Sequence, residues 1–261
     1  MVAQQPDIAT RLDRGLKDLH LPAMRRHYSP CAEEAVSQQL SYQGYLLALV
    51  EHEAQMRRQN TIARLLRQSR LPLEKTLESF DMSRLDRRVC QQVRSLMDGS
   101  FLSRTENILS FGNPGSGKTH LLCALGQELV QQGHKVYFSS CSLLVQELLR
   151  AKRDLQLDRL LAKLSKYEAL IIDDLGYVQQ DRQEMEVLFT LLAGRYERGS
   201  VMLTSNLPFS KWEAIFKDPM TTAAAIDRLV HHSVILELNL PSYRMEQAKQ
   251  RKAKAHNTQP P

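Results

Sequence analysis

Apolar residues recur at helical spacing along the first part of the chain. Leu12, Leu16 and Leu19 lie three to four positions apart, and similar spacing returns twice before Pro72 without strand-like alternation. The residue before a proline disfavours the helical conformation, so the last of these helices should end near Pro72. The pattern predicts a small all-helical domain over residues 1–71.

Beyond this domain the pattern changes. Residues 72–106 read as a connector with a helix around Leu85–Met97. From residue 107 onward, short apolar runs alternate with longer helical stretches, which is typical of a parallel sheet with helices on both faces. We therefore expect an α/β core over residues 107–245, followed by a polar, basic and disordered tail over 246–261. The predicted strands contain Ile108–Phe111, Val136–Phe138, Ala169–Ile172, Val201–Thr204 and Val234–Leu238.

A glycine-rich loop follows the first predicted strand and precedes a predicted helix. It matches the eight-residue phosphate-loop (Walker A) pattern, in which backbone N–H groups and the helix N-terminus surround a phosphate. The lysine of such a loop reaches the outer phosphates, and the following threonine hydroxyl binds Mg²⁺. A plain strand-to-helix turn is a much weaker explanation of the full pattern. The loop consists of Gly112, Asn113, Pro114, Gly115, Ser116, Gly117, Lys118 and Thr119.

Two adjacent acids end the third predicted strand. Asp173 and Asp174 follow four apolar residues, and ligands in open parallel sheets lie at the carboxyl ends of strands. We expect Asp173 to be the carboxylate on the Mg²⁺ side (Walker B). Asp174 is placed to orient or deprotonate the attacking water, a role that indicates hydrolysis. The alternative is a solvated Asp-Asp turn.

Three further polar features are ambiguous from the residues alone. Asn206 follows the fourth predicted strand and could touch the terminal phosphate or simply make a turn. Arg228 could stabilise transition-state charge from a neighbouring subunit, or pair with a nearby acid on the surface. His231 and His232 are adjacent, and we expect a solvated or packed pair rather than a metal site.

Composition adds modest constraints. The 261 residues include 35 Lys and Arg against 29 Asp and Glu, a net charge of +6 that favours a polyanionic partner. The four cysteines form no CxxC pair, so we expect reduced thiols. Neither a membrane-spanning run nor a signal peptide is evident, which predicts a cytoplasmic protein with no membrane partner.

The chain resembles the IstB family, whose members are ATP-binding helper proteins of bacterial insertion sequences. The resemblance extends from about Leu73 to Arg244, and several of its motifs are shared with the related DnaC helicase loader. Besides the phosphate loop with its Thr119-His120-Leu extension, the motifs are Phe80-Asp81, Ile172–Tyr177, Arg195–Arg198, Thr204-Ser-Asn206, Phe209–Trp212, Asp227–His232 and Ser242-Tyr-Arg244.

The resemblance implies an AAA+ fold in which ATP lies between the subunits of a homo-oligomer. It implies that Asn206 is the first sensor, that Arg228 is the arginine finger, and that the nucleotide-binding set extends to His120 and Arg244. Arg244 would be a second sensor or an intersubunit contact. Its position is in doubt, because Asn239-Leu-Pro241 stands where the family usually carries a glycine.

The resemblance also implies binding to double-stranded DNA without strong sequence preference, and stimulation of a partner transposase. A stripe of arginines on the last N-terminal helix could follow DNA phosphates, although such a stripe is also typical of a solvated helix face. We predict that these arginines bind DNA: Arg57, Arg58, Arg64, Arg67 and Arg70.

Other functions remain open. A helicase loader would use the same ATPase core to hold a replicative helicase. A small-molecule kinase would need an acceptor pocket and usually an arginine-bearing lid, and the sequence indicates neither. A scaffold that binds ATP without hydrolysing it is opposed only by Asp174.

Overall fold

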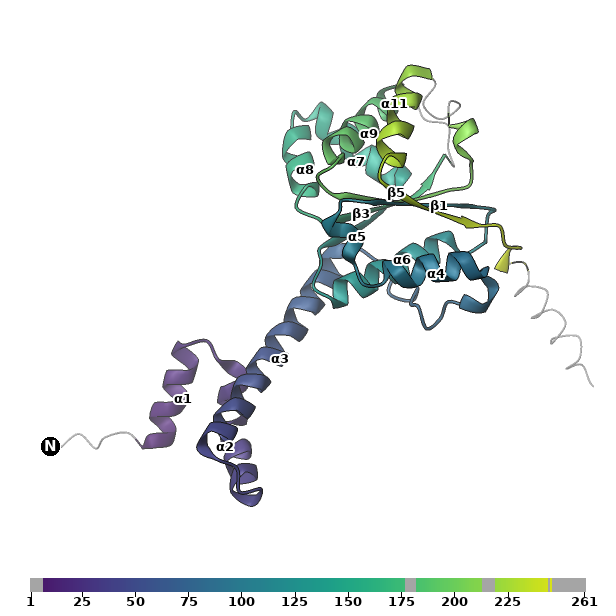
Figure 1. Cartoon of the computed structure of the whole chain (residues 1–261). Helices are drawn as coiled ribbons and strands as arrows, with labels where there is room; N and C mark the ends of the chain where they lie inside the picture. The colour runs from purple at the N-terminus through teal and green to yellow at the C-terminus, as the bar shows by residue number, and fades with distance from the viewer. Residues whose placement is uncertain (1–6, 177–181, 213–218, 244, 246–261) are drawn as a thin grey trace, which may run out of the picture. The chain divides into compact units, whose positions relative to one another are not determined.

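The computed structural model describes residues 7–176, 182–212, 219–243 and 245 (Figure 1). The chain divides into two compact units, residues 1–64 and residues 65–261. Among the described residues, no helix is both long enough and apolar enough to cross a bilayer. The division falls within a long helix, and the functional boundary proposed near residue 71 stays a prediction.

The first unit is helical, which confirms the prediction. It contains α1 (Ile8–Asp18), α2 (Pro22–Ser37) and the larger part of α3 (Tyr42–Ser69). A buried carboxylate joins two of them. Glu53 of α3 accepts hydrogen bonds from the backbone N–H groups of Ala23 (2.8 Å) and Met24 (3.2 Å). These amides belong to the first turn of α2, where no intrahelical acceptor exists, so Glu53 caps that helix.

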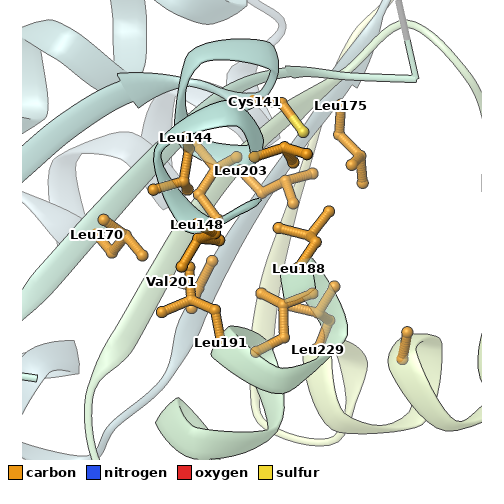
Figure 2. Close-up of a cluster of buried hydrophobic side chains, with 14 of the residues drawn as sticks. Cys141, Leu144, Leu148, Leu170, Leu175, Leu188, Leu191, Val201, Leu203 and Leu229 are labelled. Carbon is orange, nitrogen blue, oxygen red and sulfur yellow. The ribbon is translucent and has the colours of Figure 1, made fainter. Parts of the chain in front are cut away.

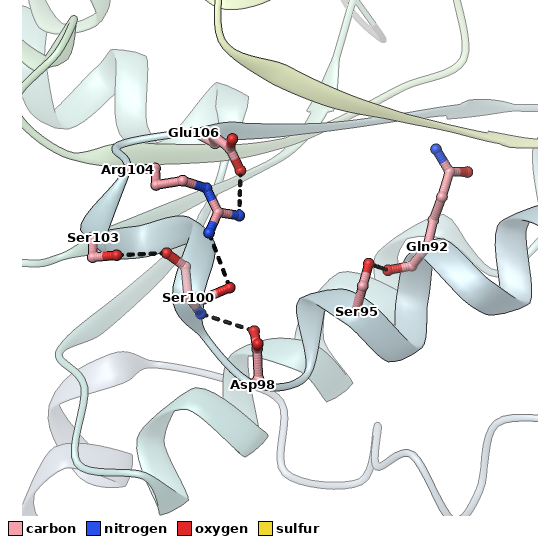
Figure 3. A network of polar contacts seen from close by, with 7 residues as sticks. All are labelled: Gln92, Ser95, Asp98, Ser100, Ser103, Arg104 and Glu106. Carbon is pink, nitrogen blue, oxygen red and sulfur yellow. Dashed lines mark hydrogen bonds and ion pairs between the residues drawn. The ribbon is translucent and has the colours of Figure 1, made fainter.

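A connector leads to the sheet through the short helix η1 (Met82–Arg84), α4 (Arg87–Leu96) and α5 (Ser100–Ser103). The helix predicted around residues 85–97 is thus confirmed. Local polar contacts turn the chain from α4 toward the first strand (Figure 3). Asp98 accepts the N–H of Ser100 at 2.9 Å, and Arg104 donates to Glu106 at 2.9 Å.

Within its described residues, the second unit contains a five-stranded parallel sheet in the order β2-β3-β4-β1-β5. Helices cover both faces, with α7, α8, α9 and α11 on one side and α4 and α6 on the other (Figure 1). This is the AAA+ P-loop NTPase fold, as predicted. The strands are β1 (Asn107–Gly112), β2 (Val136–Ser140), β3 (Ala169–Leu175), β4 (Ser200–Ser205) and β5 (Ser233–Leu238). The helices are α6 (Lys118–Gln131), α7 (Cys141–Arg153), α8 (Leu157–Leu164), α9 (Arg182–Arg195), η2 (Phe209–Lys211) and α11 (Pro219–Val230).

Leucines dominate the core between the sheet and its first helical layer (Figure 2). Leu144 and Leu148 of α7 pack with Leu188 of α9, and none of the three exposes any side-chain surface. Burying each such side chain contributes about 1.5–3 kcal/mol. The central strands are apolar on both faces because helices cover both, which explains their unbroken apolar runs.

One arginine is buried at the amino-terminal edge of the sheet. Arg195, at the end of α9, is 4% exposed, and burial lowers its pKa to about 10. Its guanidinium donates to four backbone carbonyls at 2.9–3.1 Å, so the charge is solvated by peptide dipoles. These bonds join the turns that precede β3 and β4; the acceptors are the carbonyls of Leu164, Tyr167, Glu168 and Ser200.

Candidate nucleotide-binding site

The glycine-rich loop joins β1 to α6 in a conformation that only glycine adopts without strain. Gly112, Gly115 and Gly117 have φ values of 149°, 79° and 99°. A Cβ atom at Gly112 would also collide with the carbonyl of Leu238. The loop therefore turns tightly and ends at the first amides of α6, where the helix favours an anion.

Lys118 lies under this loop and is 4% exposed. Its ammonium donates to the carbonyls of Gly112 (2.8 Å) and Asn113 (2.9 Å) and to Oδ1 of Asn206 (2.6 Å). The positive charge is thereby held at the mouth of the loop. A phosphate oxygen placed there would exchange with a carbonyl acceptor and gain a charge-assisted hydrogen bond.

Asp173, 8% exposed, lies beside the start of α6. Its Oδ1 accepts hydrogen bonds from the hydroxyls of Thr119 (2.8 Å) and Thr204 (2.7 Å). A carboxylate and a hydroxyl side by side form the kind of oxygen donor set that Mg²⁺ takes. The residues present thus fit that ion.

Asp174 lies at a β-bulge in β3. Its φ is +60°, and the pairing of β3 with β4 shifts register between Ile172 and Leu175. The backbone N–H of Asp174 donates to the hydroxyl of Thr204 at 2.8 Å, which stabilises this conformation. Asp173 is buried, whereas Asp174 is exposed and lines the cavity, as expected for successive residues of a strand, whose side chains point to opposite faces.

Asn206 follows β4 in a turn that is anchored by its neighbour. The hydroxyl of Ser205 donates to the carbonyls of Leu175 (2.9 Å) and Leu207 (3.1 Å). Because β4 lies between β1 and β3, this turn lies between the phosphate loop and the acid pair. The amide of Asn206 therefore meets Lys118, a contact that no sequence spacing indicates.

A cavity of about 270 Å³ opens beside these groups. One wall is the connector ahead of α4. The ring of His120 holds it, with Nε2 at 2.9 Å from the carbonyl of Thr76 and 3.1 Å from the hydroxyl of Ser79. Phe80 packs edge-on to the same ring, at 5.3 Å between centroids. His120 thus lines the cavity, and its ring positions this wall.

Another part of the lining comes from the segment after β5, which contains Leu240 and Tyr243. The N–H of Tyr243 donates to the carbonyl of Gly115 at 3.0 Å, which attaches this segment to the phosphate loop. Arg84 donates to the carbonyl of Pro241 at 3.0 Å, and its guanidinium lies 5.1 Å from the centre of the Tyr243 ring. Both side chains line the cavity.

Arg228 does not line the cavity of its own chain. Its Nη1 donates to the carbonyl of Ala224 at 3.0 Å, and its guanidinium stacks on Phe189 at 4.9 Å. A role at the ATP of the same chain is therefore not apparent, whereas a role toward a neighbouring subunit stays a prediction. Arg244 and Tyr177 lie outside the described residues.

The two adjacent histidines lie at the surface near an acid. Tyr196 Oη is 2.9 Å from Nδ1 of His231, and Nε2 of His232 is 4.0 Å from a carboxylate oxygen of Glu197. The two histidines and the glutamate are all exposed. The sequence could not show Glu197 as their neighbour, because it belongs to a separate segment of the chain.

The arginines predicted to bind DNA are all exposed. Arg57, Arg58 and Arg64 belong to the first unit, and Arg57 is held by Glu53 at 2.9 Å. Arg67 and Arg70 belong to the second unit. Exposure leaves these side chains accessible, and their binding to DNA stays a prediction.

Sequence reasoning did not single out Thr204, Arg84 or Tyr243 as site residues. Thr204 is the next-to-last residue of β4 and belongs to the Thr204-Ser-Asn206 motif, which was the available signal. Tyr243 belongs to a motif already noted. Arg84 had no comparable signal, because only the folded connector brings it to the cavity.

Solved structures show the same fold. A DnaA structure from Aquifex aeolicus with bound AMPPCP is 21% identical, with a TM-score of 0.55; the match covers 74% of this chain and 58% of that one. A structure of the DnaC helicase loader is 17% identical, with a TM-score of 0.51, covering 57% of this chain and 88% of that one. Identities this low show the fold alone.

Sequence comparison is more specific. An insertion sequence ATP-binding protein of Sinorhizobium fredii is 43% identical over 251 residues, covering 96% of this chain and 84% of the relative. The family of IstB-like ATP-binding proteins matches residues 14–252. Since that match takes in both the phosphate loop and the acid pair, the chain belongs to the IstB-like ATP-binding protein family.

Proposed function

We propose that the protein is a Mg²⁺-dependent ATPase that acts as a DNA-binding helper of transposition. The observation that carries the ATPase is the hydrogen bond of 2.8 Å between Thr119 and Asp173, next to the buried ammonium of Lys118. A buried cation beside a hydroxyl and a carboxylate matches both charges of a metal–triphosphate complex. Family membership supports ATP as the nucleotide.

The phosphates would bind along the loop from Gly112 to Thr119. The backbone N–H groups of its glycines and the start of α6 supply donors, and Lys118 supplies a full positive charge. Thr119 and Asp173 would hold Mg²⁺. When bound, Mg²⁺ neutralises charge on the β- and γ-phosphate oxygens.

Asp174 would act on the attacking water. It lines the cavity, and its exposure leaves the carboxylate accessible to that water. As the water oxygen bonds to the γ-phosphorus, the bond from phosphorus to the leaving oxygen of ADP breaks, and Asp174 orients the water or takes its proton. Asn206, now bonded to Lys118, is placed to donate an amide hydrogen bond to the γ-phosphate or that water.

The biological setting rests on family and relatives. Relatives that match nearly the whole chain are named as insertion sequence ATP-binding proteins. By this relation the partners are double-stranded DNA, a transposase of the same element and further copies of the chain. Arg228 would then reach ATP from a neighbouring subunit. Residues 1–71 would contact DNA or partners, residues 107–245 would hydrolyse ATP, and the work would take place in the cytoplasm.

The size of the protein in solution tests this proposal. We expect a large complex only when duplex DNA and ATP are both present, measured by light scattering. The same species without DNA would favour an ATP-stabilised scaffold. A complex that forms with a replicative helicase, and not with DNA and a transposase, would favour a helicase loader. Transfer of phosphate to a small acceptor would indicate a kinase.

A further inference from the structure

A second feature of the ATPase unit is a groove lined by basic side chains at the opposite ends of the strands. Lys135 directly precedes β2, and Lys166 precedes β3 by three residues. Both therefore lie at the amino-terminal edge of the parallel sheet, whose carboxyl-terminal edge holds the acid pair at the end of β3. Two adjoining cavities, about 780 and 430 Å³, share Arg70, Lys163 and Lys166. We call their joint lining the basic groove.

The charge of the basic groove is strongly one-sided. It contains seven basic side chains and two acidic ones, Glu147 and Asp154. The net charge of this surface is therefore nearly as large as the net charge of the whole chain, which is +6. The basic residues come from the end of α3, from α7 and α8, and from the turns before β2 and β3; they are Arg67, Arg70, Lys135, Arg150, Arg159, Lys163 and Lys166.

One of the two acids is already neutralised. Glu147 forms an ion pair with Arg70 at 2.8 Å and accepts a hydrogen bond from the hydroxyl of Tyr137 at 3.3 Å. The guanidinium of Arg70 lies 5.1 Å from the centre of the Tyr137 ring. This network holds Arg70 in the lining that the two cavities share. Within the described ranges, no ion pair involves Lys163, Lys166 or Arg159, and all three are exposed.

We propose that the basic groove binds the sugar–phosphate backbone of duplex DNA. The proposal deepens the proposed function and depends on it for the DNA partner. Exposed cations of one sign attract phosphates through counterion release, without reading bases. Two tyrosines line the groove: Tyr137 is 3% exposed and lies under Arg70, and the half-buried ring of Tyr167 packs against the Tyr137 ring at 5.1 Å between centroids. A double strand therefore fits this surface better than a single strand.

The groove also differs from the nucleotide site in kind. The nucleotide site is built from glycines, helix amides and a buried lysine, whereas the groove offers flexible side chains over a wider space. Because the two sites lie at opposite ends of β3, DNA and ATP can be bound at the same time. The ATPase unit would then hold DNA itself, in addition to any contact from the N-terminal arginines.

The test compares two triple variants of the full chain with equal loss of charge. The first is Arg159→Gln, Lys163→Gln, Lys166→Gln in the groove. The second is Arg87→Gln, Arg88→Gln, Arg94→Gln on α4, where all three arginines are exposed. Duplex DNA of random sequence is titrated at several salt concentrations by fluorescence anisotropy, and a nucleotide titration and a melting curve check that each variant is folded.

We expect the groove variant to bind DNA at least tenfold more weakly, with a salt slope that falls by about 0.9 for each phosphate that the variant no longer neutralises. The α4 variant should keep most of the DNA affinity and most of the salt slope of the wild type. Equal affinity and slope in the wild type and the groove variant would overturn the groove while leaving the proposed function intact. A wild-type chain that binds no duplex DNA would instead overturn the helper function, and the groove proposal with it.

Discussion

The hydroxyl of Thr119 and the carboxylate of Asp173 are joined by a hydrogen bond of 2.8 Å across 54 residues of sequence. This contact links the first turn of α6 to the end of β3. It places two oxygen donors side by side at the carboxyl edge of the sheet, next to Lys118. The nucleotide site therefore depends on how β1 and β3 are arranged in the sheet.

Thr204 should be needed to orient both acids. Thr204→Val removes the hydroxyl that donates to Asp173 and accepts from the N–H of Asp174. Asp173 would keep only its hydrogen bond from Thr119, and the N–H of Asp174 would lose its acceptor, a loss that costs about 1–3 kcal/mol. We expect a raised Mg²⁺ requirement and slower turnover, measured by Mg²⁺ titration of ATPase activity. Thr204→Ser keeps the hydroxyl and should restore both; a valine variant with normal Mg²⁺ dependence would contradict this role.

Lys118→Ala should weaken ATP binding. The ammonium contributes a charge-assisted interaction worth about 1.5–3 kcal/mol, so affinity should fall roughly ten- to a hundredfold. A fluorescent ATP analogue measures this change. Lys17→Ala, which removes an exposed lysine of the N-terminal unit, is the matched control. Unchanged affinity in the Lys118 variant would show that the phosphates bind elsewhere.

Asp174→Asn should separate binding from hydrolysis. Asparagine tolerates the positive φ of 60° at this position, so the bulge should persist. ATP affinity should change little, while turnover should drop by about 10²–10⁴, because a group that orients or deprotonates water is removed. Single-turnover phosphate release measures the effect, with Asp154→Asn as a control for charge. Normal turnover would remove Asp174 from the chemistry.

Arg195 should stabilise the second unit. Arg195→Met leaves four carbonyl acceptors without their donor, and we expect a decrease on the order of 3 kcal/mol in the free energy of unfolding. Arg195→Lys should recover only part of the lost stability, since an ammonium group cannot reproduce the planar set of donors of a guanidinium. Urea denaturation of both variants measures these differences. Equal stability of the methionine variant and wild type would contradict the role.

Glu53 should make the N-terminal unit sensitive to acid. Burial alone would raise its pKa, but hydrogen bonds from Arg57, Met24 and Ala23 outweigh burial and lower the pKa below its ordinary value of 4.5. The resulting stability is present above the unfolded pKa and is lost as pH falls through the folded pKa. Glu53→Gln should therefore be less stable than wild type at about pH 6. The difference in melting temperature between the two proteins should become smaller below about pH 4.5. Thermal melts across this range measure this difference, and a constant difference would rule out the linkage.

Much of the fold could be read from local pattern. Apolar runs between helical stretches indicated all five strands, and the phosphate loop was recognisable from glycines whose conformations no other residue adopts freely. Asp173 was recognisable because acids at the end of a buried strand lie where ligands bind in parallel sheets. These features depend on residues that are close together in the chain, so the sequence alone carries them.

The arrangement of these parts depended on contacts between distant segments. The insertion of β4 between β1 and β3 brought Asn206 to Lys118 and Thr204 to Asp173. A register shift between Ile172 and Leu175 accompanies the positive φ of Asp174. Strand order and register follow from packing over the whole sheet, which no local spacing encodes. The same reason kept the basic groove hidden, because its cations come from segments that meet only when the chain has folded.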